Sequence, residues 1–242
     1  MNATRPAFYA LAPGGWRDYV TLVHPPYTLW HLAYVVIGAA LAPRFDAPLL
    51  GWALLAFFLA LGIGAHALDE LRGRPLQTLI PTRTLVALAA ASIAGAAAIG
   101  IVVAARRDLW LLAFVAAGSA LVVAYNLELF GGAFHGDPWF SLGWGAFPVL
   151  TAYFAAAHTL RSPALLAAVF AALLSRAQRV LSTPVRELRR RTRSVSGQIE
   201  RTDGTVVPVD AQSIAASPEL ALQTLSVAVV ALALALVLVR VT

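Results

Sequence analysis

The chain has 242 residues, of which 60% are hydrophobic and 12% are charged, and its formal net charge is +6. This composition excludes an ordinary soluble protein, because the apolar residues fall in blocks long enough to cross a lipid bilayer as helices. The absence of cysteine excludes disulfide bonds and thiol chemistry. No nucleic-acid-binding motif is present, so we attribute the positive charge to membrane topology and anionic lipid headgroups.

Seven apolar segments predict an all-α, polytopic bundle of about seven transmembrane helices. A closed β-barrel is not expected, since the segments lack the alternation of apolar and polar residues that barrel strands require. The expected spans are 27–42, 48–68, 84–105, 109–126, 138–157, 163–176 with a polar continuation, and 219–239. The predicted parts of the chain are a cytoplasmic lead-in (1–26), six helices (27–181), an arginine-rich loop (182–217) and a last helix (218–242).

Orientation follows from the 18 basic residues, all of them arginine. With seven spans, 13 arginines lie on one side of the membrane and 5 on the other. The positive-inside rule places the richer side, with the N-terminus, in the cytoplasm and the C-terminus outside. We therefore expect a multi-pass protein of the cell membrane, in contact with membrane lipid.

The end of the second span carries a cluster of ionisable residues. If the helix continues to Glu70, then His66, Asp69 and Glu70 share one face and converge on one ion. Two carboxylates and an imidazole suit Mg²⁺ or a transition metal, and the spacing alone does not choose between them. The alternative is an ordinary helix end, where the two acids pair with Arg72, Arg74 or Arg83 at the headgroups.

An arginine stripe follows the sixth span. Its members recur at spacings of three, four and seven residues, although Pro184 is expected to break or kink any helix that passes through it. Bidentate guanidinium contacts suit a diphosphate, with Arg176 and Arg179 as candidate contacts. The alternative is an interfacial segment that lies on anionic lipid. Further on, Asp203-Gly204 between short polar and β-branched runs predicts a small hairpin.

The segment between the fourth and fifth spans forms a third polar cluster. It contains Tyr125, Asn126, Glu128, His135 and Asp137 and no arginine. Its carboxylates therefore need water, a metal, a substrate group or a cation from another loop. Asp137 has an alternative role as the N-cap of the fifth helix, and Asn126 has one as a hydrogen-bonding partner of a neighbouring helix.

These residues resemble a known family. An apolar span that ends in acidic residues, followed by Arg74-Pro75-Leu76, looks like the first signature of the UbiA superfamily of intramembrane prenyltransferases. Pro25-Pro26-Tyr27-Thr28-Leu29 is similar to the opening of the family's first helix, and Tyr125-Asn126 falls where the family often has a tyrosine. The family's second acidic signature has no counterpart, since Glu187 is the only acid in 175–191.

The resemblance implies a helical bundle with a central cavity that binds an isoprenyl diphosphate, with Mg²⁺ assisting its departure, and passes the prenyl group to an acceptor of unknown identity. It implies that Asp69 and Glu70 ligate the metal, and that Arg72 and Arg74 contact the diphosphate. Departure of the diphosphate concentrates negative charge, which cations must stabilise. Tyr125 and Asn126 join the two acids as candidate catalytic residues.

Alternatives from other classes remain open. A terpene cyclase of the same superfamily would use the same acids and arginines. A membrane metalloenzyme would instead ligate a transition metal such as zinc, iron or copper. A non-catalytic protein would bind anionic lipid or a partner through the arginine-rich loop. The candidate ligands of the transition metal are His66, Asp69, Glu70, His135 and Asp137.

Overall fold

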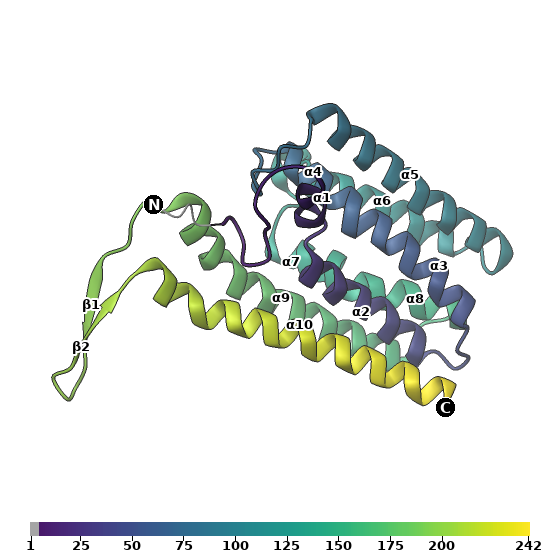
Figure 1. Cartoon of the computed structure of the whole chain (residues 1–242). Coiled ribbons are helices and arrows are strands. Elements are labelled where there is room, and N and C mark those ends of the chain that lie inside the picture. Colours follow the sequence, from purple (N-terminus) through teal and green to yellow (C-terminus); the bar gives the residue numbers. More distant parts are fainter. Residues whose placement is uncertain (1–4) are drawn as a thin grey trace.

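The structure is a computed structural model that describes residues 5–242. The described chain is mostly helical (Figure 1), with one two-stranded hairpin. The α-helices are α1 (Trp16–Leu22), α2 (Pro25–Leu41), α3 (Ala47–Phe57), α4 (His66–Leu71), α5 (Thr82–Arg106), α6 (Leu111–Asn126), α7 (Asp137–Phe140), α8 (Phe147–Ala157), α9 (Ser162–Arg191) and α10 (Ala211–Val241). A short 3-10 turn, η2 (Phe130–Gly132), follows α6.

Two π-helical segments continue α-helices without a break. They are η1 (Phe58–Ala65), which joins α3 to α4, and η3 (Ser141–Ala146), which joins α7 to α8. Such segments are rare and are frequently found at functional sites. Each lies directly beside residues that line the cavity described below, so the altered helical pitch helps to set the direction of those side chains.

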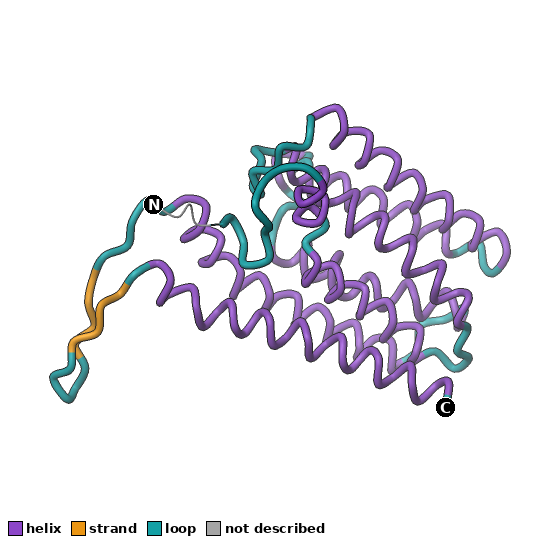
Figure 2. The backbone as a smooth tube through the Cα atoms, in the orientation of Figure 1, coloured by secondary structure: helices purple, strands orange, loops and turns teal. Residues whose placement is uncertain are grey.

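The prediction of a helical membrane bundle is confirmed at the level of helix length and composition. Five helical stretches are long and apolar enough to cross a membrane: Ala47–Leu71, Thr82–Arg106, Asp137–Ala157, Ser162–Arg191 and Ala211–Val241. The two other expected spans correspond to α2, with 17 residues, and α6, with 16. Figure 2 shows the connecting segments gathered at the two ends of the bundle.

The helices pack closely through small residues. Trp30, Tyr34 and Val149 lie in the buried cluster that joins α2, α8, α9 and α10. A side chain at Gly38 of α2 would overlap the carbonyl oxygen of Val149, and one at Gly145 of η3 would lie 2.6 Å from the carbonyl oxygen of Ala171 in α9. These two glycines therefore allow neighbouring helices to approach backbone to backbone.

The expected break at Pro184 does not occur, because α9 runs as one helix from Ser162 to Arg191 with the proline inside it. A proline removes one backbone hydrogen bond, which normally costs about 3 kcal/mol. Here Pro184 is exposed, so solvent or headgroups can satisfy the freed carbonyl group of Val180 on the outer face. As a result, the arginine stripe is mostly helical rather than a loop.

The segment after α9 is shorter than predicted. The arginine-rich loop was expected at 182–217, but α9 continues to Arg191 and α10 begins at Ala211, which leaves 192–210 between them. Within it, β1 (Gly197–Glu200) pairs antiparallel with β2 (Val206–Val209), as the Asp203-Gly204 turn predicts. The hairpin projects from the bundle in Figure 1.

Candidate functional site

A polar cavity of about 580 Å³ lies where α2, α4, α6 and α9 meet the N-terminal segment. Its ionisable lining is mainly cationic, with six arginines against three carboxylates. The arginines are Arg72, Arg74, Arg179, Arg186, Arg190 and Arg191, and the carboxylates are Asp69, Glu128 and Glu187. An excess of positive charge in a recessed site attracts and concentrates anions.

Three arginines of α9 form one row along the cavity, which we call the arginine row: Arg179, Arg186 and Arg190. Spacings of seven and four residues keep them on one face of a helix with 3.6 residues per turn. Arg186 donates to Thr183 Oγ1 at 3.0 Å, and Arg190 donates to the carbonyl oxygen of Pro6 at 3.1 Å. Within residues 5–242, neither of these two arginines has a carboxylate partner within 4.0 Å.

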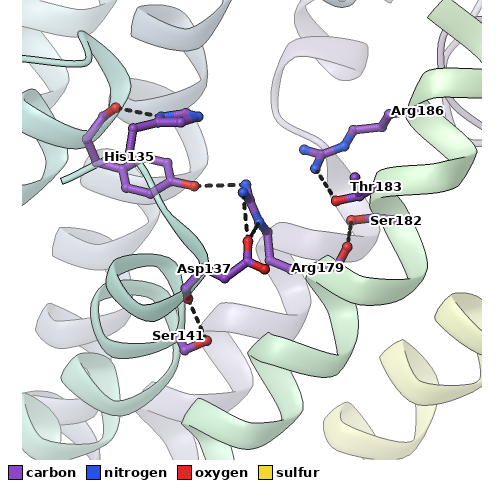
Figure 3. A network of polar contacts seen from close by, with 8 residues as sticks. His135, Asp137, Ser141, Arg179, Ser182, Thr183 and Arg186 are labelled. Atoms are coloured by element: carbon purple, nitrogen blue, oxygen red, sulfur yellow. Dashed lines mark hydrogen bonds and ion pairs between the residues drawn. The ribbon is translucent and has the colours of Figure 1, made fainter. Parts of the chain in front are cut away.

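Arg179 is held by three neighbours, two of them from the third polar cluster. Its Nε donates to Asp137 Oδ1 at 3.0 Å, and another guanidinium nitrogen donates to the hydroxyl oxygen of Tyr125 at 2.9 Å. The guanidinium also lies 5.3 Å from the ring centre of Phe140. Figure 3 shows Arg179 and Arg186 extending from α9, with Asp137 beside Arg179. The missing cation for Asp137 is therefore supplied by α9.

The adjacent acids Asp69 and Glu70 face different surroundings. Asp69 lines the cavity, where its charge interacts with those of Arg190 and Arg186. Its carboxylate makes no hydrogen bond or ion pair within residues 5–242. Glu70 is fully buried and accepts hydrogen bonds from the backbone N–H groups of Leu76 and Thr78, both at 2.9 Å, and from Thr78 Oγ1 at 2.8 Å.

The predicted convergence of these acids is therefore wrong for Glu70. Its two oxygens are occupied by the loop that follows α4, because that loop turns back along the helix and presents its N–H groups to the carboxylate. The residue fixes the loop that carries Arg74-Pro75-Leu76 and does not line the cavity. Asp69 is the one acid of the pair that reaches the site.

Two stacked histidines line the cavity. The rings of His24 and His66 lie 3.9 Å apart between centres. Their Nδ1 atoms lie 2.8 Å from the carbonyl oxygen of Leu22 and 3.1 Å from that of Gly62, and His31 makes the same kind of contact with η3. Since a carbonyl oxygen only accepts, each Nδ1 donates, which leaves each Nε2 with a lone pair. Burial lowers the pKa of His24 well below its usual value, and the neighbouring His66 lowers it further.

The predicted diphosphate contacts divide into three groups. Arg72 lines the cavity but pairs with Glu128 at 2.7 Å, with both side chains well exposed. Arg74 lines the cavity and donates to the carbonyl oxygen of Ile80 at 2.6 Å, so that it braces the loop. Arg176 is exposed and lies outside the cavity lining.

The other candidate residues lie at the end of α6 and after it. Tyr125, Asn126 and His135 line the cavity. The Asn126 amide donates to the carbonyl oxygen of Val122 at 2.7 Å, within its own helix, so the expected bond to a neighbouring helix is absent from the described contacts. Asp137 is the first residue of α7 rather than its N-cap, and it pairs with Arg179.

Only part of the expected metal-ligand set reaches the cavity. Within residues 5–242, no group of three or more histidine, aspartate or glutamate side chains is placed to hold a metal ion. Of the five predicted ligands, Glu70 is bound by its own loop and Asp137 by Arg179. Only His66, Asp69 and His135 reach the cavity. This set is poor in carboxylates for paired Mg²⁺ ions, which prefer oxygen ligands.

An apolar groove adjoins the polar cavity. It is formed by α3 with η1, α5, α6, and η3 with α8, and many of its lining residues are alanine or glycine. Trp144 lines both the groove and the cavity. Its ring stacks on that of Phe140, with ring centres 5.5 Å apart. The site as a whole is therefore amphipathic, with a cationic part and an apolar part that meet at an aromatic pair.

Several cavity residues were not selected by sequence reasoning, namely His24, His31, Gln178, Arg186 and Arg190. The two arginines belong to the stripe that the sequence showed, and a continuous helix would have placed them with Arg179. The two histidines carry no local signal, because only tertiary packing brings them to the cavity. Gln178 is buried and its Oε1 has no hydrogen-bond partner in the described chain.

No protein-family model, curated protein or solved structure matches the chain. The class of protein is therefore defined by the fold and the site: residues 5–242 form a helical bundle with five helices long and apolar enough to cross a membrane, and with a cationic cavity beside an apolar groove.

Proposed function

We propose that the chain is a UbiA-like integral membrane prenyltransferase that acts on an isoprenyl diphosphate. The observation that carries this proposal is the juxtaposition of the cationic cavity and the apolar groove, which share Trp144. An isoprenyl diphosphate has the same two parts, a polyanionic head and a long apolar tail. The head fits against the arginine row, and the tail fits along the alanine- and glycine-rich groove.

The chemistry follows from this placement. When the bond between the prenyl carbon and the diphosphate oxygen breaks, the electron pair leaves with the diphosphate and the carbon becomes cationic. Guanidinium groups stabilise the departing charge because they are fixed and point at it before the reaction begins. The faces of Phe140 and Trp144, close to the arginine row, suit the positive carbon through cation–π attraction.

Three polar groups, just before α2 and on α4, suit the molecule that accepts the prenyl group. The Nε2 atoms of His24 and His66 and the carboxylate of Asp69 can accept hydrogen bonds and make none within residues 5–242. They suit a molecule that presents a hydroxyl group. The new bond then forms between its oxygen and the prenyl carbon, and the hydroxyl proton passes to one of these acceptors.

We further propose seven spans, counting α2 and α6. With that number the cavity, the loop after α4 and the arginine row lie on the arginine-rich side, and the positive-inside rule supports a cytoplasmic location for it. Water-soluble isoprenyl diphosphates then enter from the cytoplasm, and the apolar tail is buried within the membrane.

A terpene cyclase is the second candidate, and the Phe140–Trp144 pair favours it because a cyclising cation also needs an aromatic wall. The two activities differ in their requirement for an acceptor. A cyclase releases diphosphate and a hydrocarbon from the isoprenyl diphosphate alone, whereas a transferase needs an added acceptor fraction.

The experiment uses purified protein in phosphatidylcholine nanodiscs with radiolabelled farnesyl or geranylgeranyl diphosphate, with and without a bacterial membrane lipid extract. We expect release of diphosphate and a labelled lipid product that depend on the extract. Arg186→Gln should reduce both, whereas Arg176→Gln, on the same helix but outside the cavity, should not.

Binding provides a second readout. If the groove holds the tail, geranylgeranyl diphosphate should bind at least about 100-fold more tightly than inorganic diphosphate, because each buried methylene contributes about 0.8 kcal/mol. Ala97→Phe, which fills the groove, should remove most of this difference and leave the affinity for inorganic diphosphate unchanged. Equal affinity of the wild type for the two ligands would contradict the proposal.

A further inference from the structure

The carboxylates of the cavity are few and mostly occupied. Glu128 pairs with Arg72 at 2.7 Å, and Glu187 is exposed on α9. Asp69 is therefore the one cavity carboxylate that is both recessed and without an ion-pair partner in the described chain. A divalent ion that bridges a diphosphate to a protein is usually held by one or two carboxylates together with phosphate oxygens and water. Asp69 alone would supply the minimum of this set, and six arginines surround it in the cavity lining.

The arginines of the cavity, in contrast, are in excess over the carboxylates that could pair with them. Arg186 and Arg190 are four residues apart on one helix face, where like charges repel, and Arg179 adds further repulsion. No carboxylate in residues 5–242 lies within 4.0 Å of either Arg186 or Arg190. A bound polyanion would relieve this repulsion. Guanidinium groups are also suited to bind a phosphate-containing anion, since each planar group can donate two parallel hydrogen bonds to phosphate oxygens.

We infer that the arginine row of α9 holds the diphosphate group directly, so that binding of the isoprenyl diphosphate does not require a divalent metal ion. Arg179, fixed by Asp137 and Tyr125, forms the rigid end of the row, and Arg186 and Arg190 supply the donors that have no carboxylate. The inference rests on the proposed function and deepens it, because it replaces the missing second acidic signature by guanidinium groups.

The arrangement also predicts whether substitution of Asp69 strengthens or weakens diphosphate binding. In a metal-bridged site Asp69 would be a ligand, and its loss would weaken binding. In the metal-free site Asp69 is a negative charge near the polyanion, and its loss removes repulsion. Asp69→Asn should therefore tighten binding of the diphosphate, by about twofold to tenfold for charges that interact across a partly solvated cavity.

The test is isothermal titration of farnesyl diphosphate into the protein in phosphatidylcholine nanodiscs, once with EDTA and once with MgCl₂. For the wild type we expect dissociation constants within about threefold of each other. Arg186→Gln and Arg190→Gln should each weaken binding about tenfold or more in EDTA, since each removes charge-assisted hydrogen bonds. Arg176→Gln is the matched control and should bind as the wild type does.

The possible outcomes separate the inference from the proposed function. Binding that appears only with MgCl₂, or that is lost in Asp69→Asn, would overturn the inference and leave the proposed function standing. Absence of binding under both conditions would overturn both. Displacement of farnesyl diphosphate by phosphatidylglycerol at an equal concentration would identify the arginine row as a lipid-headgroup site and would also overturn both.

Discussion

Replacement of Glu70 by glutamine tests whether this acid is a structural anchor or part of the site. The carboxylate accepts three hydrogen bonds at 2.8 to 2.9 Å and is 0% exposed. In Glu70→Gln the remaining carbonyl oxygen keeps the two bonds from Thr78. The new amide group then faces the N–H of Leu76, so that two donors oppose each other.

The magnitude follows from these three contacts. A hydrogen bond to a charged group contributes about 1.5 to 3 kcal/mol, and a neutral one about 1 kcal/mol. Loss of the Leu76 bond and weakening of the two Thr78 bonds together predict that Glu70→Gln lowers the free energy of unfolding by about 3 kcal/mol. Asp69→Asn is the matched control, with an expected change below about 1 kcal/mol because no hydrogen bond is lost.

The assay is equilibrium unfolding in mixed micelles of a mild detergent and dodecyl sulfate, followed by tryptophan fluorescence. Limited proteolysis provides a second readout, since Glu70→Gln should expose 72–81 to cleavage. An unfolding free energy for Glu70→Gln within about 0.5 kcal/mol of the wild type, together with loss of ligand binding, would refute the structural role.

Two other predictions concern packing and pH. Gly38→Ala should cost about 1 to 3 kcal/mol in unfolding free energy, because α2 must move away from the Val149 carbonyl group; Gly51→Ala, with no atom near the added carbon, should be neutral or slightly stabilising. Because the pKa of His24 is lowered in the folded state, the unfolded state binds protons more readily below about pH 6.5. The contribution of His24 to the free energy of unfolding should therefore be fully present above that pH. Below it, the free energy of unfolding should decrease by up to about 1.4 kcal/mol per pH unit. His24→Gln should have a smaller slope, and an unchanged slope would contradict the prediction.

The candidate site was only partly accessible from the sequence. Tyr125, Asp69 and Arg179 were selected because polar residues at the ends of apolar spans stand out in composition, and all three line the cavity. Arg176 was selected with Arg179 because both belong to the same stripe. The cavity lining on α9 begins at Gln178, which leaves Arg176 outside it. The sequence did not show where along the stripe the cavity would begin, because Pro184 was expected to interrupt the helix.

The sequence by itself determined the helical membrane class, the positions of the apolar helices and the hairpin at Asp203-Gly204. These features depend on local hydropathy and turn chemistry, which adjacent residues specify completely. Only the tertiary structure decided which of two neighbouring acids reaches the cavity, and which cation pairs with Asp137 from 42 residues away. The same holds for the stacking of His24 on His66. Such pairings depend on how whole helices pack, because the partners lie on different helices and no local pattern couples them.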